Sequence, residues 1–227
     1  MIRRVKMKLS ENTVSVLKNF SNINQNILVK EGDTLHTMST MKNIIGRASI
    51  EESFDREFGI YDLNEFLGVM SLSKNADLVF DEKFVQVKNG KSRVKYFFSD
   101  SSILVTIPEG FNPPETDCTF RISQTTLTDV TKACSVLQLP DVVIRNEDGV
   151  GVLVATDLKN TTSHEYKVEL DPIDFPANFH FKIDNLKMMA GDYDLSVASD
   201  KNVSHWTHKT KAIQYWIALE PESSYND

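Results

Sequence analysis

The chain has 227 residues, of which 41% are hydrophobic and 25% are charged, and its formal net charge is −7. These values are near those of ordinary globular proteins and exclude a disordered or low-complexity chain. No stretch approaches the roughly 18 apolar residues of a membrane span, so we expect a soluble protein, and the acidic balance is unlike that of a conventional nucleic-acid binder.

The first half of the sequence predicts two short helices and several strands. A helix is expected over residues 11–22, where Val14, Leu17 and Phe20 form an apolar stripe. The aliphatic strand ILVKEGD follows, and later FGI runs into a second helix over 62–70. The run VQVKNGKSRVKYFF predicts an antiparallel hairpin that turns at Asn89-Gly90.

The second half repeats this order. After a proline-rich stretch at 108–117, a helix is expected over 125–137, with an apolar stripe of Leu127, Val130, Cys134 and Leu137. The run VVIRNEDGVGVLVA predicts a hairpin that turns at Asp148-Gly149, and a fourth helix is expected over 183–189.

The repetition predicts a duplicated unit. FGIYDLNEFL in the first half and FHFKIDNLKMM in the second are both strand-to-helix stretches, and the elements before them match in order with an offset of about 115 to 120 positions. We therefore expect an α+β protein with two tandem domains, 1–107 and 118–227, joined by a connector over 108–117. Each domain would combine antiparallel sheets with two short helices.

Signatures of catalysis or cofactor binding are missing from the sequence. Cys118 and Cys134 are too few for a disulfide framework, and His205 and His208 lie three apart on a predicted strand, where side chains point to opposite faces. The chain has no phosphate-binding G-x-x-x-x-G-K-[ST] loop. We expect no enzyme activity, no metal and no cofactor.

Several stretches resemble one known family, the DNA polymerase sliding clamp of the T-even bacteriophage kind. They are the start MKLS with LKNF and INQNILVK, then IYDLNEFLGVMSL, GDYDLSVAS and IALEPESS. The resemblance covers essentially the whole chain from Met7. The preceding MIRRVK is either an upstream start or a basic arm.

This resemblance implies a ring of three subunits, in which twelve helices line a hole that encircles duplex DNA and the sheets form the outside. The ring would tether the replicative polymerase for processive synthesis in the cytoplasm of the infected bacterial host. Because topology retains a ring on DNA, a few lumenal cations suffice. The candidates, each of which could instead be a solvated surface charge, are Lys18, Arg121, Lys132, Lys182 and Lys187. The helix over 62–70 has acidic residues and no cation.

The resemblance also implies two contact surfaces. The last strand of the first domain, at Ile103, Leu104 and Val105, would pair with SHEYKVEL of the next subunit, where Tyr166 and Val168 are the apolar partners. Alternatively, this edge is covered within its own subunit. A peptide pocket beside the connector would draw on Val105, Ile107, Phe111, Pro113, Ile217, Leu219 and Pro221. Phe111 could instead simply anchor the loop.

Partners that follow from the resemblance are the DNA polymerase, an ATP-dependent clamp loader and late-transcription factors. The alternative function is a phage structural or assembly protein built from a duplicated β-rich domain.

Overall fold

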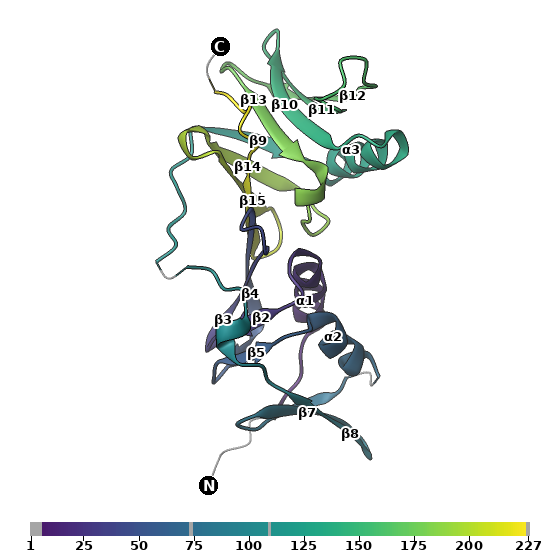
Figure 1. Cartoon of the computed structure of the whole chain (residues 1–227), viewed down its shortest axis with the longest axis vertical. Helices are drawn as coiled ribbons and strands as arrows, with labels where there is room; N and C mark the ends of the chain where they lie inside the picture. The colour runs from purple at the N-terminus through teal and green to yellow at the C-terminus, as the bar shows by residue number, and fades with distance from the viewer. Residues whose placement is uncertain (1–5, 73–74, 109, 226–227) are drawn as a thin grey trace. The chain divides into compact units, whose positions relative to one another are not determined.

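The computed structural model describes residues 6–72, 75–108 and 110–225. The chain divides into two compact units, Met1–Glu109 and Gly110–Asp227, which we describe one at a time (Figure 1). Residues 1–5 of the basic MIRRVK segment lie outside the described residues. Within the described residues, no helix has the length and apolar character needed to cross a bilayer.

The first unit contains two α-helices, one four-stranded antiparallel sheet and two further strand pairs. The helices are α1 (Glu11–Ile23) and α2 (Leu63–Ser71). The sheet has the order β1-β6-β7-β8, with β1 (Lys6–Met7), β6 (Asp77–Phe80), β7 (Phe84–Asn89) and β8 (Ser92–Phe97). The other pairs are β2 (Ile27–Val29) with β5 (Phe58–Ile60), and β3 (Gly32–Met38) with β4 (Ile44–Phe54).

Side-chain caps fix where these helices begin. The Ser10 hydroxyl accepts a hydrogen bond from the Thr13 N–H at 3.1 Å, and the Asp62 carboxylate accepts one from the Glu65 N–H at 2.9 Å. The buried face of α1 is Thr13, Val16, Leu17, Phe20 and Ile23. The predicted stripe was therefore wrong at Val14, which is only half-buried. Val16 and Thr13, which lie four residues before Phe20 and Leu17, face the core instead.

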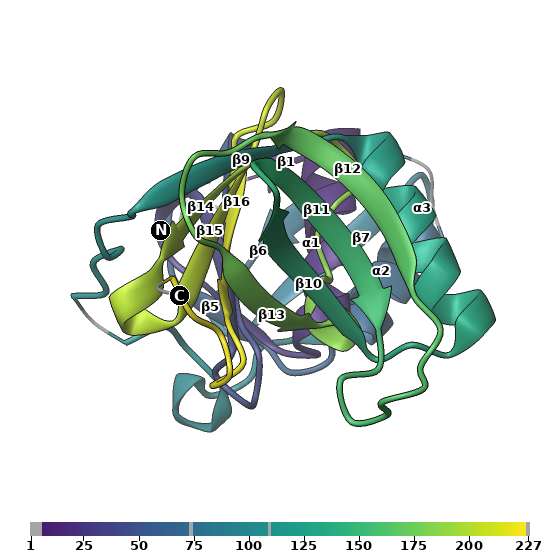
Figure 2. The ribbon, with the colours of Figure 1, turned by 90° about the horizontal axis from the view of Figure 1, so that it is seen from above.

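The second unit contains one α-helix, α3 (Gln124–Leu137), and two sets of antiparallel strands. One sheet has the order β12-β11-β10-β13, with β10 (Asp141–Glu147), β11 (Val150–Thr156), β12 (Tyr166–Pro172) and β13 (Asn178–Lys182). Strand β14 (Tyr193–Ala198) pairs with β9 (Cys118–Ile122) and with β15 (Val203–His208), which in turn pairs with β16 (Ile213–Ala218). Figure 2 shows α3 alongside β11 and β12, which it contacts.

The predicted fourth helix over 183–189 was wrong. The chain makes only a single 3₁₀ turn, Ile183–Asn185, and that turn has no side-chain cap. Seven residues are too few to nucleate a stable helix, and Asp184 and Asn185 at its start have low helix propensity. Tyrosine side chains bind the Met189 backbone instead: its N–H donates to the Tyr215 hydroxyl, and its carbonyl accepts from the Tyr193 hydroxyl.

The two units nevertheless repeat one arrangement. In each, a capped helix leads into an aliphatic strand that pairs antiparallel with the strand of the echoed sequence: β2 with β5, and β10 with β13. The second hairpin turns at Asp148-Gly149 as predicted, with φ angles of 53° and 85°. The first turns at Gly90-Lys91, one residue later than predicted, because Asn89 still pairs with Ser92.

The α3 stripe was correct for Val130 and Cys134, which are buried, and wrong for Leu127, which is only half-buried, and for Leu137, which is 39% exposed at the end of the helix. Gln138 ends α3 in the left-handed conformation.

Candidate functional site

The helices carry two of the five cations predicted to face DNA. Lys18 lies on α1 and Lys132 on α3, and both side chains are exposed. Helix α2 contributes Glu65 and no cation, as its sequence indicates. Both lysines are therefore accessible, and their contact with a phosphate backbone stays a prediction.

The other three predicted cations have different surroundings. Arg121 lies on β9, where it pairs in register with Asp194, and it lines a groove with Glu169, Asp171 and Asp192. This acidic groove is a poor environment for a phosphate. Lys187 is exposed in the segment that follows the 3₁₀ turn, outside any helix.

Lys182 has a structural partner. Its ammonium group forms an ion pair with Asp141, whose side chain is completely buried, and this contact raises the pKa of Lys182 above its ordinary value. The second oxygen of Asp141 accepts a hydrogen bond from the Leu158 N–H at 3.0 Å. Because the Asp141 carboxylate is shielded from water, its buried charge needs the Lys182 ammonium group beside it as a counter-ion.

The predicted edge strand at Ile103, Leu104 and Val105 is absent. Ser101–Ile103 forms a 3₁₀ turn that begins at Asp100, whose carboxylate accepts a hydrogen bond from the Ser102 N–H. Asp is favoured at the start of such turns because its carboxylate accepts a hydrogen bond from a backbone N–H two residues later, and a neighbouring strand is then not needed as the acceptor. Leu104 is buried, and the Val105 N–H donates to the Asn26 side chain at 2.9 Å, so this backbone is already occupied.

Among the sheet edges of the described residues, β8 and β12 are candidate subunit contacts. Strand β8 is the last strand of its sheet in the first unit, and β12 is the first strand of its sheet in the second. On β12, the predicted partners Tyr166 and Val168 are half-buried, in alternation with exposed Lys167 and Glu169. An unpaired edge is a template for another strand, so β8 and β12 are each suited to pair with a strand of another subunit.

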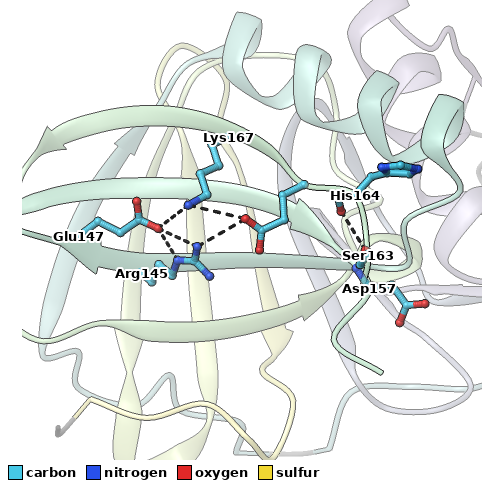
Figure 3. Close-up of polar contacts among 7 residues, drawn as sticks. Arg145, Glu147, Asp157, Ser163, His164 and Lys167 are labelled. Atoms are coloured by element: carbon cyan, nitrogen blue, oxygen red, sulfur yellow. Dashed lines mark hydrogen bonds and ion pairs between the residues drawn. The ribbon is translucent and has the colours of Figure 1, made fainter. Parts of the chain in front are cut away.

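A network of four charged residues lies on β10 and at the start of β12 (Figure 3). Glu147 accepts hydrogen bonds from Arg145 at 2.7 Å and from Lys167 at 2.9 Å, and these contacts hold the pKa of Glu147 below its ordinary value. Glu165 lies within 3.6 Å of Lys167 and 3.8 Å of Arg145. The positive charge of Lys167 is therefore balanced by Glu147 and Glu165.

The residues predicted to form the peptide pocket are divided between the two units, and two of them are buried. Val105 and Ile107 lie in the first unit, and the other five residues lie in the second. Ile217 is 0% exposed and Leu219 is 6% exposed, so both are core residues that a peptide cannot touch. Pro113 and Pro221 are not buried.

Trp216 supports Phe111 from the core of the second unit, a contact that the sequence did not reveal. The Phe111 ring contacts it edge-on, with centroids 5.3 Å apart, and His205 stacks on it at 4.7 Å. Trp216 is 4% exposed, yet its indole N–H has no hydrogen-bond partner among the described residues. Burial lowers the pKa of His205, which favours the neutral ring beside Trp216.

The described residues hold no cluster of three or more metal-ligating side chains. Burial raises the pKa of Cys118 to about 12, which leaves this thiol protonated and unreactive.

Comparisons with known proteins agree on one family. Residues 8–106 match the family model described as DNA polymerase processivity factor, and residues 119–221 match that of the gp45 sliding clamp C-terminal domain. The sliding clamp of Vibrio phage KVP40 is 34% identical over 94% of this chain and 99% of its own length. That of Enterobacteria phage T4 is 26% identical over 97% of this chain and all of its own length.

A solved structure of A. fulgidus PCNA, bound to the C-terminal region of FEN-1, has the same fold. Its TM-score is 0.70 at 16% identity, and the match covers 97% of this chain and 99% of that one.

Proposed function

Because this chain belongs to the phage sliding clamp family of DNA polymerase processivity factors, we propose that it works as a ring that encircles duplex DNA and tethers the replicative polymerase. The observation that carries this function is the family match in both halves, 8–106 and 119–221, on a chain whose two units repeat one arrangement.

The ring would contain three copies, since three duplicated chains give six similar units around the DNA. We propose 1–107 and 118–227 as the two clamp domains and 108–117 as their connector. The helix count of the resemblance needs correction here: only three α-helices per chain are present in the described residues, so the lining has fewer than twelve.

The acidic charge is compatible with this function. Each copy has a net charge of −7, so a ring cannot depend on tight, charge-driven DNA binding. Closure around the duplex retains it instead, and a few cations are enough to keep the DNA centred. Lys18 and Lys132 are the best candidates for contact with DNA, and Lys187 remains a third. Lys182 instead stabilises the fold through its ion pair with Asp141. Arg121 is the weakest candidate because its neighbours are acidic.

Partner proteins would bind beside Phe111. Phe111, which is 36% exposed, offers an apolar contact suited to a short peptide with a few apolar anchors, and the buried Trp216 ring supports it from below. The FEN-1 segment on the A. fulgidus protein supports peptide binding by this fold. We propose the polymerase, an ATP-dependent loader and late-transcription factors as users of this site.

The clamp would act without catalysis, in the cytoplasm of the infected host. A structural or assembly role is not favoured, because the similar proteins named above are sliding clamps along their full length.

Primer extension tests the function. On a primed circular template with the cognate polymerase and ATP-driven loader, we expect the protein to lengthen the products of single binding events severalfold. Product lengths that do not respond to the protein would contradict the function.

A further inference from the structure

The four-stranded sheet of the first unit has one face turned away from helix α2. On β8, the Tyr96 ring packs against Phe66 of α2, with ring centroids 5.3 Å apart. Side chains alternate between the two faces of a strand, so Arg93, Lys95 and Phe97 lie on the opposite face, and all three are exposed. We call this side of the sheet the open face.

Two rows of cations cross the open face, because residues opposite each other in a ladder share a face. One row runs from Lys95 on β8 through β7 and β6 to Lys6 on β1. In the next row, Arg93 on β8 lies opposite Lys88 on β7. Arg93 and Lys95 form no ion pair within the described residues.

The open face carries an excess of positive charge. Its second row ends at Asp77, which forms an ion pair with Lys6 at 2.9 Å and lies 3.9 Å from Lys8. The hydrogen bond from Lys6 lowers the pKa of Asp77, and the charges of Lys8 and Lys88 add to this effect. The rest of the chain is acidic, with a net charge of −7 overall, but salt screens charges beyond about 8 Å. The open face is therefore a local site of attraction for a polyanion.

An aromatic pair lies beside these cations. Phe84 and Phe97 are opposite each other in the β7–β8 ladder, with ring centroids 5.6 Å apart. The Lys95 Nζ lies over the Phe84 ring, 4.8 Å from its centroid. Phe97 is 66% exposed, so most of its ring is open to stacking by a flat partner.

A single strand of DNA fits this combination better than an acidic peptide does. Sheet faces bind single strands by stacking bases on aromatic side chains while Lys and Arg contact the phosphates. Arg93, Lys95 and Phe97 follow one another at every second residue of β8, about 7 Å apart, so an extended strand can reach all three in turn. The apolar anchor of a peptide instead needs a groove or pocket, whereas Phe97 projects from a sheet face.

We propose that the open face of the β1-β6-β7-β8 sheet binds single-stranded DNA, with a base stacked on Phe97 and phosphates bound by Lys95 and Arg93. This contact goes beyond the proposed ring, because the hole of the ring takes duplex DNA, whose bases are already paired and stacked. It does not depend on ring closure. A few phosphate contacts give weak binding, with a dissociation constant of about 1 to 100 µM.

Fluorescence anisotropy with a labelled oligo-dT of about 12 nucleotides tests the site. Arg93→Ala/Lys95→Ala should weaken binding roughly 25-fold at about 0.1 M salt, since each lost phosphate contact makes the plot of log affinity against log salt less steep by about 0.7. Phe97→Leu should weaken binding about fivefold or more, and Phe97→Trp, which keeps a stacking ring, should not. The matched control Lys159→Ala/Lys211→Ala removes two exposed lysines of the second unit and should leave the affinity unchanged.

Three results would overturn the proposal. The first is a wild-type protein that does not bind oligo-dT at concentrations up to about 1 mM. The second is loss of binding in Lys18→Ala/Lys132→Ala but not in Arg93→Ala/Lys95→Ala, which would place the strand in the hole of the ring. The third is a poly-glutamate peptide that binds as tightly as oligo-dT with the same sensitivity to Phe97→Leu, which would make an acidic peptide the occupant.

Urea denaturation of each variant checks that its fold is intact. Failure of the single-strand site would leave the ring standing, because primer extension tests the ring separately.

Discussion

Replacing Lys182 with methionine should destabilise the fold rather than weaken DNA binding. The Asp141 carboxylate is fully buried, and Lys182, whose side chain is 34% exposed, is its ion-pair partner. Methionine keeps the length of the aliphatic stem and removes the charge. Asp141 then keeps the hydrogen bond from the Leu158 N–H, at 3.0 Å, without a cation beside it.

The cost can be bounded. Breaking a buried ion pair from one side typically costs about 3 to 5 kcal/mol. The cost is lower here because the lysine end of the pair is partly open to water, which screens the interaction. We expect the substitution to lower the unfolding free energy by about 2 to 3 kcal/mol at pH 7.

Urea denaturation of wild type, Lys182→Met and Lys132→Met measures this directly. Lys132 is an exposed lysine on α3, so its change should alter the unfolding free energy by less than about 0.5 kcal/mol. Equal stability of the two variants would refute the structural role of Lys182. In the wild type the raised pKa of Lys182 means that the stabilisation is complete below about pH 10.5 and is lost as pH rises through the higher value.

Other changes have equally definite outcomes. Replacing both Lys18 and Lys132 with alanine should make the plot of log DNA affinity against log salt less steep, by about 0.9 for each phosphate that is no longer neutralised. An unchanged slope would show that these lysines do not contact DNA. Phe111→Ala should weaken binding of a polymerase-tail peptide by about 1 kcal/mol or more in calorimetry, whereas an anchor of the loop alone would leave affinity intact. Gly59→Ala should cost about 2 kcal/mol in urea denaturation, since the added methyl would meet a backbone carbonyl oxygen at 2.7 Å and a leucine methyl at 2.6 Å; wild-type stability would refute this clash. Burial lowers the pKa of His205, so as pH falls the unfolded chain binds a proton at this histidine before the folded chain does, and stability falls below about pH 6.5. The melting temperature of His205→Phe should therefore fall less between pH 7.5 and 5.5 than that of the wild type. An identical fall in both proteins would contradict this.

The sequence predicted the duplication and the hairpins well because both depend on local signals. Asp148-Gly149 needs positive φ at both turn positions, and Asp and Gly supply it at low cost. Helices α1 and α3 begin at serine caps, Ser10 and Ser123, that a sequence shows directly. These features require no knowledge of distant contacts.

The failures came from long-range contacts. The stretch over 183–189 has helical spacing, but two distant tyrosines hold the Met189 backbone outside a helix. Ile103 and Val105 have strand-forming side chains, but the turn at Asp100 and the Asn26 side chain take their backbone. Local propensity is a weak prior where tertiary partners compete for the same groups.

The candidate site shows the same division. Lys18 and Lys132 were identified from helix faces and are exposed on them, because amphipathic periodicity reports exposure. Lys182 looked equivalent, but only the fold shows the buried carboxylate beside it. Trp216 was missed because the face of β16 that meets Phe111 depends on packing beyond the strand itself.

Retention on DNA tests the central claim most directly. The protein would be loaded onto nicked circular DNA by its ATP-driven loader, and the amount bound would be measured before and after the circle is cut once. A ring held by topology should stay on the circle and slide off after cutting. Equal retention on circular and linear DNA would show direct binding and contradict the sliding clamp mechanism.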